Sequence, residues 1–270
     1  MRTLLRFRRS VEEARCDQDR ETLHRLRVRA KRVRSLLRFL SFLSNDTAGP
    51  KGAIRRTKAL FKTSGAVRQV QVSASLLRTL SQAQTRTLNA GVVHVRRKER
   101  ALNERLHQTF ERLRPKDLQR LELHALRALH ERGKTQLREG AQAFIRSELH
   151  HATRLTRAAD AHLHLHEVRK HLKHVLHLFD LLDPGIPRPD GLAKLLDRLG
   201  DWHDAVVLQD MLLTMKDHRK ERDQLLAAVE HHLQLQQKHV LRLMRKSIGK
   251  WGIDAAWFQG VWFKAGLTDL

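Results

Sequence analysis

A run of basic side chains between residues 23 and 40 has the spacing of a binding site for an anion. The run contains no Gly or Pro, and its apolar residues recur at steps of three and four, which predicts an amphipathic helix. Beside the apolar stripe, at about 1.5 Å of rise per residue, stand the residues that we name the basic ladder: His24, Arg27, Lys31, Arg34 and Arg38. Like charges one helical turn apart repel each other, so the ladder destabilises the helix unless an anion lies along it. We therefore interpret it as an anion-binding surface; the alternative is an ordinary solvated basic face.

The same pattern recurs between residues 165 and 179. There His166, Arg169 and Lys173 take the places of the first three ladder residues, whereas Leu176 replaces Arg34. Each copy is followed by a helix-sized segment and then by a turn-like sequence that contains glycine. Two copies of a long pattern in the same order predict an internal duplication.

These residues resemble the conserved histidine α-helical domain, the CHAD family. Its signature is the His-to-Arg ladder helix, repeated in each half and followed by a Gly-containing turn with an Asp, as in the segment from Gly200 through Asp204. The resemblance extends from the first helix to Trp251, although Gln69 stands where the first turn of the family has Asp. It implies two four-helix bundles, related by a pseudo-twofold axis, with a basic channel between them that binds inorganic polyphosphate.

The ladders and the resemblance together predict which side chains contact polyphosphate. Arg offers a planar fork to two phosphate oxygens, Lys a point charge, and His a hydrogen-bond donor that becomes charged beside an anion. The set comprises both ladders, the basic residues of the short helix that follows each of them, and one residue of the fourth helix: His24, Arg27, Lys31, Arg34, Arg38, Arg55, Lys58, Lys62, Arg97, His166, Arg169, Lys173, Lys194 and Arg198.

Composition independently favours a globular protein with a polyanionic partner. The chain has 270 residues, of which 41% are hydrophobic, enough for a sizeable core. Its 53 Lys and Arg against 29 Asp and Glu give a net charge of +24, and self-repulsion of that size destabilises a compact state. Polyphosphate, nucleic acid and other polyanions could each compensate the charge. The single cysteine, Cys16, excludes a disulfide within the chain and a Cys-rich zinc site.

The sequence also bears on where the protein acts. The first residues lack the apolar core and the small-residue cleavage site of a secretory signal. No stretch approaches ~18 uninterrupted apolar residues, so we expect no membrane-spanning helix. We expect a cytoplasmic protein, associated with polyphosphate granules; its protein partners are not indicated.

The pattern of turn residues predicts an all-α fold. The alternating Val, Ile and Thr runs expected of strands are missing. Helices are expected, between Gly- and Pro-containing turns, over residues 9–44 as one helix or a pair of helices, and over 51–62, 67–80, 92–113, 117–157 with interruptions near Gly133 and Gly140, 161–182, 192–199, 204–215 and 221–250.

The duplication predicts that the chain consists of three parts. The helix that ends at Arg114, before Pro115, marks the predicted boundary between the halves. The first four-helix repeat then covers residues 1–114 and the second residues 115–251. Residues 252–270 form an apolar tail, interpreted as a cap over an apolar groove, with a docking patch for a partner as the alternative.

Other chemistries find less support. There is no Walker-type loop, no nucleophile elbow and no HExxH helix, and His203-Asp204 lacks the further ligands of a phosphohydrolase metal site. We expect Asp204 either to cap the next helix or to orient a ladder Arg. The histidine clusters are interpreted as charge that appears near pH ~6.5, with weak metal binding as a minor alternative.

We therefore predict a polyphosphate-binding protein that is not an enzyme and needs no cofactor or metal. The alternative is a basic helical protein that binds nucleic acid. Only 5% of residues are aromatic, too few for base-stacking platforms, and no helix-turn-helix is recognisable. An enzyme of phosphate metabolism is the third hypothesis, and it lacks a base, a nucleophile or a metal-ligand set.

Overall fold

A computed structural model of the chain describes residues 2–44, 50–83, 89–182, 188–248 and 251. These residues form α-helices and one short 3-10 helix and contain no strand, which confirms the predicted all-α class. In chain order the elements are α1 (Arg2–Cys16), α2 (Arg20–Ser44), α3 (Lys51–Ala83), α4 (Asn89–Arg112), α5 (Pro115–His130), α6 (Lys134–Arg157), η1 (Ala161–His164), α7 (Leu165–Leu182), α8 (Leu192–Leu213) and α9 (Arg219–Ile248).

Glycine was a poor guide to where helices end. The predicted break at Gly65 is wrong, because α3 runs through it as a single helix of 33 residues. The break before residue 204 is wrong too, since α8 continues through Gly200. Gly133 does separate α5 from α6, whereas Gly140 lies inside α6. A glycine within a helix costs only ~1 kcal/mol, which the buried residues on both sides of it, such as Leu60 and Val67 around Gly65, readily offset.

Of the two alternatives for residues 9–44, the pair of helices is confirmed: α1 and α2 are separated by a local capping signal. Asp19 precedes α2, and its Oδ1 accepts hydrogen bonds from the backbone N–H groups of Glu21 (2.6 Å) and Thr22 (2.8 Å). These bonds satisfy N–H groups that have no partner inside the helix. The chain therefore begins a new helix here, and the basic ladder lies wholly on α2.

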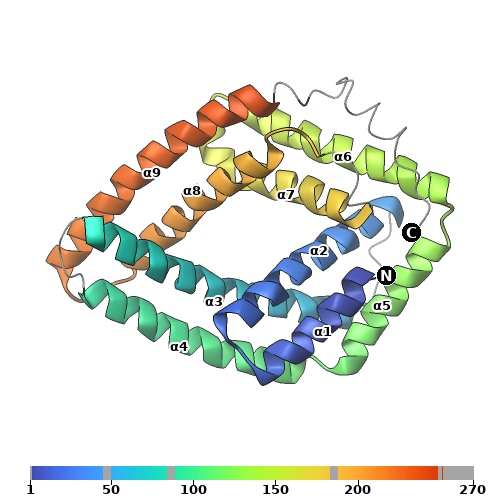
Figure 1. Ribbon diagram of the computed structural model, residues 1–270, viewed down its shortest axis with the longest axis horizontal. Coiled ribbons are helices and arrows are strands. Elements are labelled where there is room, and N and C mark those ends of the chain that lie inside the picture. The colour runs from blue at the N-terminus through green and yellow to red at the C-terminus, as the bar shows by residue number, and fades with distance from the viewer. Residues whose placement is uncertain (1, 45–49, 84–88, 183–187, 249–250, 252–270) are drawn as a thin grey trace.

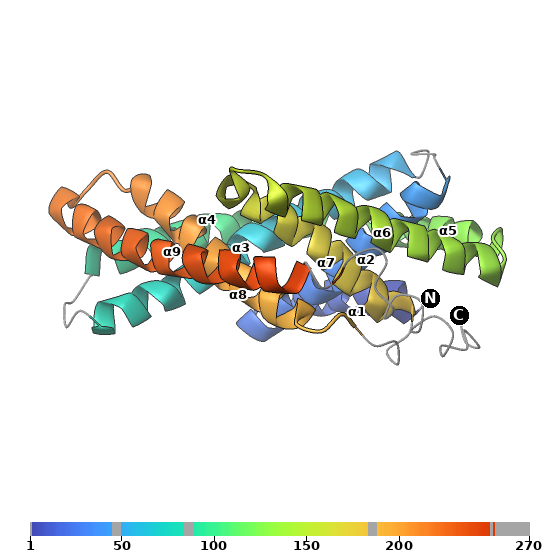
Figure 2. The same ribbon diagram turned by 90° about the horizontal axis from the view of Figure 1, so that it is seen from above.

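Four helices form a closed ring at the centre of the molecule (Figure 1). Helix α2 packs on α3, α3 on α8, α8 on α7, and α7 on α2, and we call these four the inner ring. On the outside, α1 packs on α2, α4 on α3, α6 on α7 and α9 on α8. Figure 2 shows that the molecule is elongated, with α5 at one end and the α8–α9 turn at the other.

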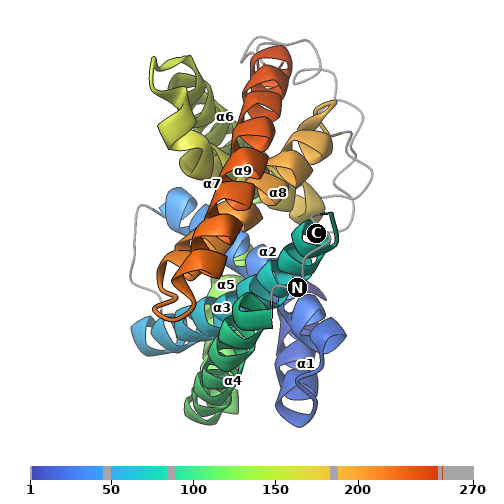
Figure 3. The ribbon, with the colours of Figure 1, turned by 90° about the vertical axis from the view of Figure 1, so that its left-hand side faces the viewer.

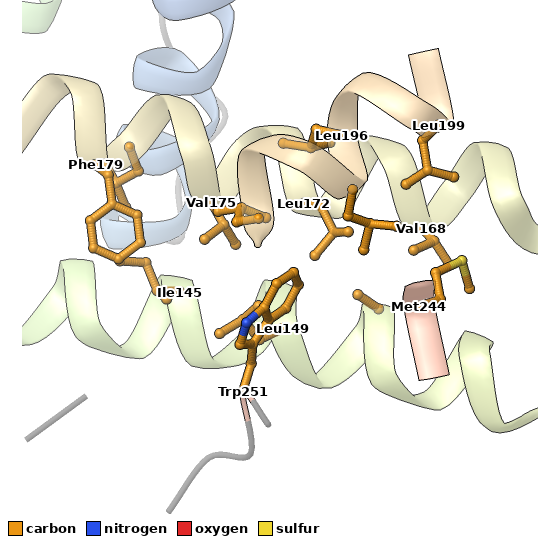
Figure 4. Packing of buried hydrophobic residues seen from close by; sticks show 14 of the residues in the cluster. Ile145, Leu149, Val168, Leu172, Val175, Phe179, Leu196, Leu199, Met244 and Trp251 are labelled. Carbon is orange, nitrogen blue, oxygen red and sulfur yellow. The ribbon is translucent and has the colours of Figure 1, made fainter. Parts of the chain in front are cut away.

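In the part of the chain that the structure describes, the buried apolar residues form three clusters. One joins α1, α2, α5 and parts of α3 and α4. A second joins α6, α7 and parts of α8 and α9, with Trp251 packed among Leu149, Val168 and Leu196 (Figure 4). The Trp251 indole N–H also donates a hydrogen bond of 2.9 Å to the backbone carbonyl of Asp190. The predicted apolar tail, residues 252–270, lies outside the described residues.

The third cluster is shared by the two halves of the chain. Val70 and Leu77 of α3 pack there with Leu208 of α8 and with Leu225 and Val229 of α9. Figure 3 views this end of the molecule, where α8 and α9 lie beside α3 and α4. Helices pack in the same order of pairs in α1–α4 as in α6–α9. The third cluster, however, takes apolar side chains from both halves, so neither half forms this part of the core alone. The division into two four-helix bundles, and the boundary at residue 114, stay predictions.

No helix in the described ranges combines the length and the apolar composition needed to cross a membrane.

Candidate functional site

The inner ring brings basic residues of the two halves together. Arg27 and Lys31 of α2 interact electrostatically with Arg169 of α7, and Lys173 interacts with all three. Helix α3 adds Arg68 and helix α8 adds one carboxylate, Asp204. We call this group the central cluster: Arg27, Lys31, Arg68, Arg169, Lys173 and Asp204. Arg27 and Lys31 of the first ladder and the matching pair of the second ladder, all predicted from their spacing, therefore lie at one common site.

Burial makes positive charge costly at this site. Burial, together with the neighbouring charges of Arg68 and Arg169, lowers the pKa of Arg27 to about 10. Lys31 has its pKa lowered to about 8, by burial and by the charges of Arg27 and Arg169. For Lys173, burial and the charges of Arg169, Lys31 and Arg27 lower the pKa to about 6. A buried cation loses hydration, and cations that share a site repel each other, so both effects favour the uncharged form.

The chain itself does not neutralise this charge. Within the described residues, Arg27, Lys31, Arg169 and Lys173 form no ion pair. The Arg169 Nε and Arg68 Nη1 groups are buried and have no hydrogen-bond partner in the part of the chain that the structure describes. Burial raises the pKa of Asp204, which weakens the only carboxylate of the cluster as a counter-ion. An anion from outside would supply both the missing charge and the missing acceptors.

Two arginines just outside the cluster, in contrast to those within it, form ion pairs with carboxylates of the chain. Arg32, on the other side of α2, pairs with Asp180 at 3.4 Å, and Arg56 of α3 pairs with the buried Asp117 at 2.8 Å. Both join segments far apart in sequence, as structural ion pairs do. Partial burial of an arginine is thus compatible with an ion pair elsewhere in the fold, whereas the half-buried cations of the central cluster form none within the described residues.

Gly65 has a specific role at the cluster. A Cβ atom at this position would lie 2.9 Å from the Nη1 atom of Arg27, closer than two such atoms can approach. The absence of a side chain on α3 thus leaves room for the Arg27 guanidinium. Gly200 stands at the matching place of the second half, and a Cβ there would meet nothing within 4 Å.

One of the two predicted histidines lies beside the cluster. The His166 and His203 rings have centroids 4.8 Å apart, and both interact with the charges of Arg169 and Lys173. Burial lowers the pKa of His166, and burial with the charge of Arg169 lowers that of His203 to about 3. Both imidazoles are therefore neutral at pH 7 and can still donate one hydrogen bond. His24 is exposed on α2 and is not among the groups that interact with the cluster.

The outer part of the first ladder leads to a second feature. Arg34, Arg38, Lys58 and Lys62 all line a cavity of about 1030 Å³ between α2, α3, α5 and α7, which we call the lateral cavity. Arg38 is already engaged there, because its Nε and Nη2 atoms donate to Glu148 Oε1 at 3.1 and 2.8 Å. His171 Nδ1 lies 2.9 Å from Glu148 Oε2, so the second oxygen of this carboxylate is occupied too.

The remaining predicted residues are dispersed. Arg55 lines a different surface pocket, together with Arg112 and Arg114. Arg97 on α4 and Lys194 on α8 are exposed, and Arg198 lies 3.6 Å from Asp201, with which it pairs. A role for these four in binding stays a prediction.

Three residues of the site had been assigned other roles or none. Asp204 lies inside α8, so the predicted cap at this position is wrong, and its electrostatic interaction with Arg169 fits the alternative of orienting a ladder Arg. Arg68 and His203 occupy equivalent places in the two glycine segments, three residues after Gly65 and Gly200. That equivalence is the sequence signal that could have identified both.

Among the described residues, no group of three or more His, Cys, Asp and Glu side chains is arranged to hold a metal ion.

Comparison with known proteins agrees with the geometry. The family model of the CHAD domain matches residues 2–213, which include α1 to α8 and therefore every residue of the central cluster. A search of curated proteins found no match to this chain. Since the matched segment covers most of the sequence, the chain belongs to the CHAD domain family.

Proposed function

We propose that the protein binds inorganic polyphosphate, with the central cluster as the principal contact. The observation that carries the proposal is a set of five half-buried cations, contributed by α2, α3 and α7, that form no ion pair within the described chain and share a single carboxylate, Asp204. Such charge is unfavourable without a ligand and strongly attractive to an anion. The CHAD family is associated with polyphosphate binding, which supports polyphosphate as the anion.

A linear phosphate chain suits the way the cations are distributed. They come from both halves of the chain and line the inner ring, so a flexible polymer can contact them in succession. Arg34 follows Lys31 by about one turn of α2, which continues the basic surface toward the lateral cavity. We infer a basic channel between two duplicated four-helix bundles, α1–α4 and α6–α9, and association of the protein with polyphosphate granules.

The decisive experiment compares polyphosphate with nucleic acid. Calorimetric titration with long-chain polyphosphate and with single-stranded DNA, at matched charge and salt, should show tighter binding of polyphosphate. The cations of the cluster are half-buried, whereas a nucleic-acid strand needs exposed cations and aromatic platforms for its bases. Tighter binding of DNA would contradict the proposed function. We further propose that the protein does not cleave its ligand, so the same mixtures with magnesium or manganese should release no orthophosphate above a protein-free control.

Substitution of Gly65 by Ala tests the geometry of the site. The added methyl group displaces the Arg27 guanidinium, so we expect Gly65→Ala to weaken polyphosphate binding, by about the tenfold that one disturbed charge-assisted contact is worth. Gly200→Ala is the matched control, since its methyl group meets no atom. Both variants exchange Gly for Ala inside a helix and should gain up to ~1 kcal/mol in unfolding free energy. Equal affinities in the two variants would show that Arg27 does not contact the ligand.

A further inference from the structure

The lateral cavity has a wall that a polyphosphate chain cannot use. Apolar side chains of α2 and α3 form part of this wall, among them Leu37, Ile54 and Phe61, all only partly buried. Polyphosphate consists of charged groups throughout and gains nothing from apolar contacts. A volume of about 1030 Å³ is at the upper end of the range for pockets that hold small organic molecules. The occupant therefore carries an apolar part.

The same cavity has a cationic rim. Arg34, Lys58, Lys62 and Arg127 line it and form no ion pair within the described residues, whereas Lys170 pairs with Glu167 at 2.7 Å. Four unpaired cations around one opening exceed what a single carboxylate would neutralise. A chain of two or three phosphates matches this charge, because Arg and Lys both bind phosphate oxygens.

Polar groups for an uncharged part of the ligand are present as well. Thr57 lines the cavity, and its hydroxyl is buried without a hydrogen-bond partner among the described residues. Glu131, which forms no ion pair there, can accept hydrogen bonds from ligand hydroxyl or amino groups. A fatty acid has no such donors, whereas a sugar and a nucleobase have several.

We propose that the lateral cavity is a binding site for a nucleoside polyphosphate. Its phosphates lie against the cations of the rim, and its base and sugar contact the apolar wall and Glu131. This site is distinct from the central cluster and does not depend on polyphosphate binding there. The Glu148 carboxylate supports it by holding Arg38 against the wall, so that the cavity stays open on that side.

The test compares ATP with tripolyphosphate, which has the same number of phosphates but no nucleoside. In magnesium-free titrations we expect ATP to bind roughly tenfold more tightly, the gain that one buried base typically provides. Ser41→Trp places an indole into the cavity from an exposed position of α2 and should abolish that difference. Arg27→Ala/Arg169→Ala should leave ATP binding within about threefold while weakening polyphosphate binding, which separates the two sites.

A second cavity variant provides an independent test in case Ser41→Trp does not fold. Lys58→Glu/Lys62→Glu should weaken ATP binding by about tenfold or more, because two rim cations become anions. Lys116→Glu/Lys238→Glu makes the same change of net charge at exposed positions on α5 and α9 and should have little effect. Equal affinity for ATP and tripolyphosphate in the parent protein would overturn the proposal. So would ATP binding that both cavity variants leave unchanged while their circular dichroism stays helical.

Discussion

Replacement of Arg27 and Arg169 by Ala is expected to weaken polyphosphate binding by at least tenfold. Each side chain presents a guanidinium fork at the centre of the inner ring, and a charge-assisted hydrogen bond contributes ~1.5–3 kcal/mol. Both guanidinium groups are partly desolvated, which strengthens their attraction to phosphate relative to an exposed arginine. The dissociation constants of the parent and the double variant, measured by calorimetry, give the effect directly.

The free double variant should fold at least as well as the parent. Removal of two buried cations that repel each other and lack counter-ions relieves an unfavourable charge interaction. We therefore expect an unchanged or higher melting temperature without ligand, together with the loss of affinity. A variant that is merely misfolded would show the opposite change in stability.

The matched control removes two arginines from exposed positions. Arg25→Ala/Arg242→Ala makes the same change in net charge, one residue on α2 and one on α9. Arg25 lies 3.8 Å from Glu21, with which it forms an exposed pair, and neither position belongs to the cluster. An equal loss of affinity in this control would mean that polyphosphate responds to overall charge and that the central cluster has no special role.

Polyphosphate affinity is expected to rise as the pH falls from 8 toward 6. In the free protein burial lowers the pKa of Lys31 to about 8 and that of Lys173 to about 6, so both lose protons within this window as the pH rises. Bound phosphate favours the charged lysines, and at pH 8 the protein must take up protons when it binds. Each pKa unit corresponds to ~1.4 kcal/mol, so the gain between pH 8 and pH 6 is roughly ten- to hundredfold.

A change of Lys to Arg isolates this effect. Arginine keeps its proton throughout the window, so Lys31→Arg/Lys173→Arg should bind at pH 8 as well as the parent does near pH 6 and show a much flatter pH profile. His24→Gln/His166→Gln is the matched control; burial lowers the pKa of His166, which disfavours its protonation, and the slope should persist. A slope that disappears in the histidine variant and remains in the lysine variant would contradict the assignment. Titrations in buffers of different ionisation enthalpy would count the protons taken up.

The part of the site that could be predicted is the part that depends on helical spacing alone. Arg27 and Lys31 lie one turn apart on an uninterrupted helix, as do Arg169 and Lys173, so the periodicity was enough to place each pair on one face. The duplication then suggested that the two faces address the same ligand. The all-α class followed in the same way from the absence of alternating apolar runs.

The features of the site that could not be predicted depend on contacts between segments far apart in sequence. The periodicity of one segment carries no information about such contacts. Arg38 has the ladder spacing, yet it is paired with Glu148, 110 residues away in sequence. Gly65 is predicted to end a helix because of its low helix propensity, whereas burial of residues on both sides of it, such as Leu60 and Val67, keeps α3 continuous. Asp204 looked like a cap for the same reason.

The core shared by α3, α4, α8 and α9 bears on how the chain folds during synthesis. A ribosome delivers the N-terminal half first, and the core that joins α1 and α2 to α5 can form as soon as α5 has been made. Val70, Leu77 and Val95 must wait, because their partners, such as Leu208 and Val229, emerge more than a hundred residues later. During that interval the nascent chain exposes an apolar surface next to a strongly basic one. We expect chaperones to bind this intermediate, and we expect a chain truncated after α7 to aggregate, since the helices that cover that surface are then never made.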